Sequence, residues 1–119
     1  MNAPAGGDCL FCRIARKELP AKVVFEDERI LAFEDIRPKA PVHVLVIPKA
    51  HFASLNEAPE GAEALLGEIL LRARAIARDK GVGESGYRVV LNTARDSGQE
   101  VFHIHFHVLG GRRLAWPPG

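Results

Sequence analysis

Polar and apolar residues alternate strictly from His103 to Val108, near the end of the chain. A period of two is typical of a β-strand with two unlike faces, so we predict a strand across residues 101–111. Neighbours on one face of a strand are about 7 Å apart, so one phosphate, or one metal ion and one phosphate, can contact more than one side chain. Imidazole is a poor substitute for valine or isoleucine in a sheet, so packing alone does not explain the polar set. One face thus carries His103, His105 and His107, and the other places Ile104, Phe106 and Val108 in a core.

Four further segments have the composition of strands. Residues 22–26 and 29–33 are rich in valine, isoleucine and phenylalanine and flank the polar pair Asp27-Glu28, which predicts a hairpin. Residues 43–47 are β-branched or apolar on both faces, so we expect a central, buried strand there. Residues 87–92 form the remaining strand of the predicted sheet.

Helical periodicity occurs in two places. Residues 9–17 have a short amphipathic pattern, which ends at Leu19-Pro20 because the residue before a proline is displaced from the α region. In residues 60–80, with Pro59 suited to the first turn and Gly81 to the C-terminal stop, apolar residues recur at spacings of three and four. The elements predict an α+β domain with a five-stranded, mostly antiparallel sheet, one long helix and a short N-terminal helix.

The composition is that of an ordinary globular domain. The 119 residues include 16 basic and 15 acidic side chains interspersed along the chain, so we expect no nucleic-acid partner. We expect residues 1–7, rich in glycine, alanine and proline, to be a disordered lead-in and residues 8–119 to form a single domain. Because there is neither a membrane-length apolar run nor the apolar core of a signal peptide, we expect a cytoplasmic protein with no membrane partner.

The chain has two cysteines, Cys9 and Cys12, separated by two residues. In a cytoplasmic protein these are free thiols, a metal site or a redox pair rather than a structural disulfide. The spacing is moderately specific for zinc, which needs two further ligands from elsewhere in the chain. The rival interpretation is that both are small, buried apolar residues.

The His-x-His-x-His motif, followed by an apolar pair and Gly110-Gly111, resembles the histidine triad (HIT) family of nucleotidyl hydrolases and transferases. The resemblance covers nearly the whole chain from about Asp8 and is strongest to the Hint branch, the purine nucleoside phosphoramidases. It implies a HIT-like fold and a homodimer in which the tail reaches the partner subunit near the active site, with residues 63–78 and 87–92 as candidate interface elements. The other matching segments are Ala32–Ile36, Val42–Lys49, Asn92, Gly98-Gln99 and Trp116–Gly119.

The resemblance also implies roles for individual residues. His105 would attack the α-phosphate and become transiently nucleotidylated, and His107 would hydrogen-bond the phosphate oxygens. His43 would lie near the nucleophile, fixing its tautomer or managing a proton, and Asp35 would accept both ribose hydroxyls. The remaining nucleotide-binding set comprises the base slot, the sugar–phosphate contact, the loop before the triad and the tail, namely Phe11, Ile14, Phe33, Ile36, Leu45, Asn92, Gly98, Gln99, Glu100 and Trp116.

Two further features bear on the cofactor and on the substrate specificity. Relatives that retain both cysteines pair them with histidines that correspond here to His51 and His103, which implies a closed, structural zinc site and no cofactor for catalysis. Where some Hint members have a serine that contacts the leaving group, this chain has Glu100, which either favours amine leaving groups or is a solvated loop carboxylate.

The function that the resemblance implies is hydrolysis of purine nucleoside 5′-phosphoramidates to a nucleoside monophosphate, AMP or GMP, and an amine. A dinucleoside polyphosphate hydrolase is the alternative within the enzymes, although the short chain and the tail at residues 116–119 argue against it. Two alternatives from other classes are a nucleotide-binding regulator whose hydrolysis is incidental and a metal-handling protein that uses five histidines and two cysteines.

Overall fold

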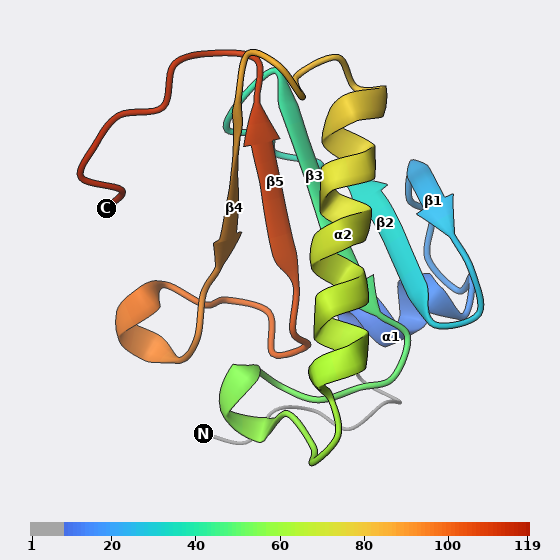
Figure 1. The fold of residues 1–119 in the computed structure, drawn as a ribbon. Helices are drawn as coiled ribbons and strands as arrows, with labels where there is room; N and C mark the ends of the chain where they lie inside the picture. Colours follow the sequence, from blue (N-terminus) through green and yellow to red (C-terminus); the bar gives the residue numbers. More distant parts are fainter. Residues whose placement is uncertain (1–8) are drawn as a thin grey trace.

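The computed structural model describes residues 9–119, and the lead-in expected at residues 1–7 lies outside this part of the chain. The predicted α+β class and the five antiparallel strands are confirmed (Figure 1). None of the helices in residues 9–119 is long and apolar enough to span a membrane. In chain order the elements are α1 (Leu10–Ala15), β1 (Val23–Glu26), β2 (Ile30–Glu34), β3 (Val42–Pro48), the 3-10 turn η1 (Leu55–Glu57), α2 (Glu63–Asp79), β4 (Tyr87–Leu91), the 3-10 turn η2 (Arg95–Ser97) and β5 (Phe106–Gly110).

The sheet has the strand order β1-β2-β3-β5-β4, and β3 is the central strand, as predicted. In the antiparallel register of β3 and β5, His43 lies opposite Leu109 and Leu45 lies opposite His107. Because side chains alternate between faces, His43 and His107 share one face as diagonal neighbours. The two residues that the sequence separates by more than half its length are therefore brought together by strand pairing.

The two faces of the sheet have separate cores. Helix α2 lies along one face (Figure 1), and its apolar side packs with Val44, Val46, Phe106 and Val108. This arrangement confirms the predicted direction of the apolar residues of the triad segment. Helix α1 packs on the opposite face, where the second core consists of Cys9, Phe11, Cys12, Ile14, Leu31, Phe33, Leu45 and Ile47.

The predicted strand across residues 101–111 is too long, because β5 begins only at Phe106. Continuing the register of β3 and β5 would place Ile104 opposite Pro48, which has no N–H to donate to a ladder. Ile104 instead donates its backbone N–H to the carbonyl of Phe52 at 2.9 Å. Of the three triad histidines, only His107 therefore lies within a strand.

The long helix begins at Glu63, three residues later than the predicted start at residue 60. Gly61 has a φ of +86°, in the left-handed region, so the turn at residues 60–62 cannot belong to a right-handed helix. Helix α2 ends at Asp79, immediately before Lys80 and Gly81, which agrees with the predicted stop.

Candidate functional site

The hydrogen bonds of His105 fix the position of its ring proton. Its Nδ1 lies 2.8 Å from the carbonyl oxygen of His103. A carbonyl only accepts, so Nδ1 carries the proton and Nε2 keeps its lone pair. Burial lowers the pKa of this imidazole below its ordinary value, which favours the neutral ring. A neutral imidazole with a free Nε2 is equipped to act as a nucleophile near neutral pH.

His43 fixes the tautomer of His107 rather than that of His105. The backbone N–H of Lys39 donates to Nδ1 of His43 at 3.0 Å, so the neutral His43 ring carries its proton on Nε2. That Nε2 lies 2.9 Å from Nδ1 of His107, which must accept. His107 is thereby left with an Nε2–H available for an anion. Of the two roles expected for His43, fixing the tautomer of His105 belongs instead to the carbonyl of His103, and managing a proton stays a prediction.

The surroundings of His43 and His107 favour the neutral form of each ring. Burial is the largest cause that lowers the pKa of His43 and of His107, for His107 to about 4. The neighbouring His105 and His43 act on His107 in the same direction, because each disfavours a second positive charge nearby. Asp35 opposes this effect without overcoming it.

Asp35 lies just beyond the end of β2, beside the histidines. One carboxylate oxygen, Oδ1, accepts the backbone N–H of Arg37 at 2.8 Å. The other, Oδ2, is 3.5 Å from Nε2 of His43 and is otherwise uncommitted. A partly exposed carboxylate with one uncommitted oxygen can accept hydrogen bonds from vicinal hydroxyls.

Four of the five residues predicted for the apolar slot lie together in the core under α1, namely Phe11, Ile14, Phe33 and Leu45. Within this group Phe11 meets the ring of His105 edge-on, with centroids 5.2 Å apart. Ile36, the fifth, is 90% exposed and does not join the cluster. The apolar surface beside His105 therefore comes from α1, β2 and β3.

The loop before the triad is held by Gln99. Its buried side chain accepts the backbone N–H of Ala94 at 2.8 Å and donates to the carbonyls of Ala53 and Val101. All its polar atoms are thus used within the fold, which leaves the loop's backbone rather than the Gln99 amide to meet a ligand. Asn92 is partly buried after β4, Gly98 has a φ of +88°, and Glu100 is exposed.

Trp116 lies in the C-terminal tail and is 81% exposed, in agreement with the prediction that it is outside the core. The guanidinium of Arg88 lies 5.9 Å from its ring centroid and donates to the carbonyl of Ala115 at 3.0 Å. These contacts hold the tail against β4 of the same chain.

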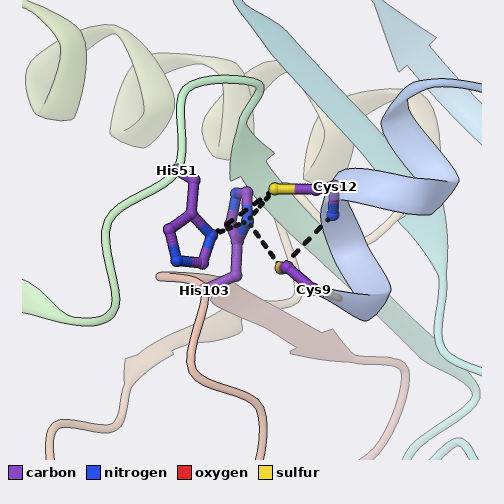
Figure 2. Close-up of side chains that lie close together, drawn as sticks. All are labelled: Cys9, Cys12, His51 and His103. Carbon is purple, nitrogen blue, oxygen red and sulfur yellow. Dashed lines mark hydrogen bonds between the residues drawn. The ribbon is translucent and has the colours of Figure 1, made fainter. Parts of the chain in front are cut away.

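A second cluster, which includes the first triad histidine, forms where Cys9, Cys12, His51 and His103 converge (Figure 2). We call this set the Cys–His cluster. Nδ1 of His103 lies 3.3 Å and 3.5 Å from the sulfur atoms of Cys9 and Cys12 and 3.2 Å from Nδ1 of His51. Nε2 of His103 lies 2.7 Å from the carbonyl of Pro48, so this nitrogen carries the proton and Nδ1 has a lone pair.

The Cys–His cluster fits a tetrahedral metal ion. One lone pair on His103 cannot accept hydrogen bonds from three neighbours at once, whereas a central cation can engage all four donor atoms. The hydrogen bond from Nε2 of His103 to a carbonyl is the usual partner of a metal-bound imidazole. Burial, followed by the hydrogen bond and charge of Cys9, raises the pKa of the Cys12 thiol to about 11, so metal binding has to displace its proton.

A second group of metal-ligand residue types, Asp35, His43 and His107, is less suited to a metal ion. Nδ1 of His43 already accepts the Lys39 N–H, so a metal on Nε2 would require an imidazolate. The geometry instead suits a hydrogen-bonded chain.

Two groups that position the site were not identified from the sequence, the N–H of Lys39 and the carbonyl of Pro48. Both are main-chain atoms, which every suitable residue supplies, so the side chain gives no signal of the role. The carbonyl of His103 belongs to the same class.

Comparison with known proteins relates the chain to one family. The HIT domain model matches residues 16–114. An uncharacterized HIT-like protein of Synechococcus elongatus is 54% identical over 112 residues, which are 94% of this chain and 97% of that protein.

Solved structures show the same similarity. The crystal structure of a HIT family hydrolase from Legionella pneumophila is similar with a TM-score of 0.92 and 55% identity, covering 94% of this chain and 100% of that one. A histidine triad nucleotide-binding protein from Candida albicans has a TM-score of 0.80 and 33% identity, covering 92% of this chain and 83% of that one.

Proposed function

The chain belongs to the HIT domain family, and we propose that it is a nucleotide hydrolase that cleaves purine nucleoside 5′-phosphoramidates to the nucleoside monophosphate and an amine. The observation that carries this proposal is the His105 ring, whose Nδ1–H is bound by the carbonyl of His103 and whose Nε2 is free. A hydrolase of Legionella pneumophila and a nucleotide-binding protein of Candida albicans share the fold, which supports hydrolysis and nucleotide binding.

The first chemical step is attack of His105 on the α-phosphorus. Its Nε2 lone pair forms an N–P bond while the P–N bond to the amine breaks, and the leaving amine takes up one proton from solvent. The ring becomes positively charged in this step, and the Nδ1–H bond to the carbonyl of His103 strengthens as that charge develops.

The second step is hydrolysis of the nucleotidyl-histidine. Water attacks the same phosphorus, the bond to His105 breaks, and the water's proton is returned to solvent, so protons balance over the cycle. In both steps the Nε2–H of His107 donates to a phosphoryl oxygen, because its Nδ1 is occupied by the hydrogen bond from His43.

The nucleoside occupies the same face of the sheet. Asp35 accepts the ribose hydroxyls through its uncommitted oxygen, and the purine packs against apolar side chains beside Phe11. We assign Asn92 and the backbone of Gly98 and Gln99 to contacts with the sugar–phosphate and the leaving group, and the exposed Glu100 to the amine side.

The Cys–His cluster holds zinc in this proposal. Cys9, Cys12, His51 and His103 are the four ligands, and their closed arrangement gives the ion a structural role. When bound, the ion joins α1 to the segment before β5. The ion takes no part in the bond-making and bond-breaking steps, which need no cofactor.

We also propose a homodimer in which the sheet's edge strand β4 and helix α2 face the partner. Within residues 9–119, β4 has no strand on its outer side, and Leu70 and Leu71 of α2 are exposed. A free edge strand and exposed leucines are each surfaces that proteins commonly cover.

Turnover of adenosine 5′-phosphoramidate and of a diadenosine polyphosphate, measured side by side, tests the proposed function. We expect faster cleavage of the phosphoramidate, with AMP and ammonia as products. Preference for the dinucleotide would assign the chain to the alternative polyphosphate hydrolases. Binding of AMP with no cleavage of either substrate would contradict hydrolysis altogether.

A further inference from the structure

We propose that the Cys–His cluster positions the catalytic nucleophile: a metal ion bound by Cys9, Cys12, His51 and His103 holds His105 in the single tautomer and orientation needed for attack. This inference rests on the proposed function of His105. It assigns the cluster a role in catalysis beyond joining α1 to the rest of the fold. Two independent sets of contacts carry it, one through the main chain of His103 and one through helix α1.

The first connection is His103 itself. Its ring is fully buried, and its Nδ1 is directed at the cluster (Figure 2). Its Nε2 lies 2.7 Å from the carbonyl of Pro48. A ring held on both sides restrains its own backbone, and the carbonyl of this residue accepts the Nδ1–H of His105 at 2.8 Å. A displacement of the His103 ring therefore changes the one hydrogen bond that selects the nucleophile's tautomer.

The second connection is Phe11, which lies between the two cysteines in sequence. Its ring packs edge-on against His105, with centroids 5.2 Å apart and planes at 90°, and also contacts His103 at 6.0 Å. Helix α1 has six residues, too few to be stable without tertiary contacts. Ligation by Cys9 and Cys12 at its N-terminal end therefore holds Phe11 against the face of the nucleophile.

The cluster is also open to exchange at one side. Cys9, Cys12 and His103 are buried, whereas His51 is partly exposed. A hollow of about 430 Å³ adjoins His51 and is lined by Glu57 and Glu60, whose charges attract cations. Metal can thus enter or leave past His51 without opening the core, which lets occupancy of the cluster vary.

The test compares metal-loaded and metal-free protein by the nitrogen signals of the histidine rings. The wild type is studied with one equivalent of zinc and after chelation, together with His51→Gln, which removes the most exposed ligand. Glu28→Gln, an exposed turn substitution, is the matched control. Backbone amide spectra verify that each sample is folded, and His105→Asn assigns the His105 signals. Turnover of adenosine 5′-phosphoramidate is measured on the same samples.

With zinc bound, we expect His105 to show one tautomer with its proton on Nδ1. After chelation and in His51→Gln, we expect signals averaged between tautomers and a kcat lower by about 10- to 100-fold, with a smaller change in KM. Cadmium(II), a diamagnetic ion that thiolates also bind, should restore the single tautomer when it is added to the chelated wild type. Failure of the wild type to bind zinc, or identical His105 signals in both states, would overturn the inference. Absence of turnover by the zinc-loaded protein would instead contradict the proposed function, and the ring signals would still decide the coupling.

Discussion

Nε2 of His43 lies 2.9 Å from Nδ1 of His107, across the pairing of β3 with β5. The direction of this hydrogen bond is set by the backbone N–H of Lys39, which occupies the other nitrogen of His43. His107 consequently carries its proton on Nε2, which is the atom that donates to the phosphate in the proposed function. Replacement of His43 by Phe should allow His107 to adopt either tautomer and should lower kcat about tenfold, the equivalent of one hydrogen bond. A kcat equal to that of the wild type in steady-state assays would contradict the assigned tautomer.

The free energy of unfolding should decrease as the pH is lowered, because His107 is buried as the neutral ring. Its pKa is about 4 in the folded protein, against 6.5 as the ordinary value. Between these values the unfolded chain binds a proton that the folded chain does not, so the free energy of unfolding decreases as pH is lowered from about 6.5 to about 4. The loss is at most about 3.5 kcal/mol for this residue.

Urea unfolding of the wild type and of His107→Asn at pH 7 and pH 5 measures this effect. Around His107, His43 and His105 lower its pKa and Asp35 raises it, and the pKa values of His43 and His105 are themselves lowered by burial. The variant should therefore retain part of the pH dependence and lose the contribution of His107. Equal losses in both proteins would show that His107 is not neutral in the fold.

Asp35 is predicted to bind the ribose, and the substitution Asp35→Asn separates this role from folding. The amide can still accept the N–H of Arg37, so the turn after β2 is preserved. Hydrogen bonds from hydroxyls to a charged group contribute about 1.5–3 kcal/mol, which corresponds to roughly a 10- to 100-fold weaker Kd for AMP. Titration calorimetry with AMP and with 2′,3′-dideoxy-AMP should show that the variant weakens only the former. An equal effect on both ligands would exclude a ribose contact.

Gly111, in the glycine pair after the triad, occupies a position that has no room for a side chain. A Cβ on Gly111 would lie 2.8 Å from Cβ of Pro41, and the residue has a φ of +92°. Gly111→Ala should therefore destabilise the fold by about 1–3 kcal/mol. Gly67→Ala is the matched control, because a Cβ there meets nothing within 4 Å in helix α2, and it should stabilise by about 0.4–1 kcal/mol. Denaturant midpoints that rank these variants in the opposite order would contradict this account.

Much of the sheet could be predicted because its signal is local. The apolar segment at residues 43–47 predicted the central strand, and alternation predicted which side chains of the triad segment enter the core. The ends of elements depended on facts outside each segment. The strand β5 starts late because its neighbour presents Pro48, and α2 starts late because Gly61 is left-handed.

The candidate site was predictable only in part, for the same reason. The family resemblance placed Cys9, Cys12, His51 and His103 together, and the structure brings them together. It did not separate Ile36, which is exposed, from the apolar residues that are buried under α1. Which nitrogen of each histidine carries a proton depends on carbonyls and backbone N–H groups from other segments, and a sequence pattern carries no signal for these.

The central claim is that His105 forms a covalent bond to the nucleotide. Wild-type protein mixed with adenosine 5′-phosphoramidate, quenched within one turnover and analysed by peptide mass spectrometry tests it directly. We expect one adenylyl group on His105 in the wild type, and neither adduct nor turnover in His105→Asn. An adduct on His107, or turnover of His105→Asn at the wild-type rate, would contradict the account.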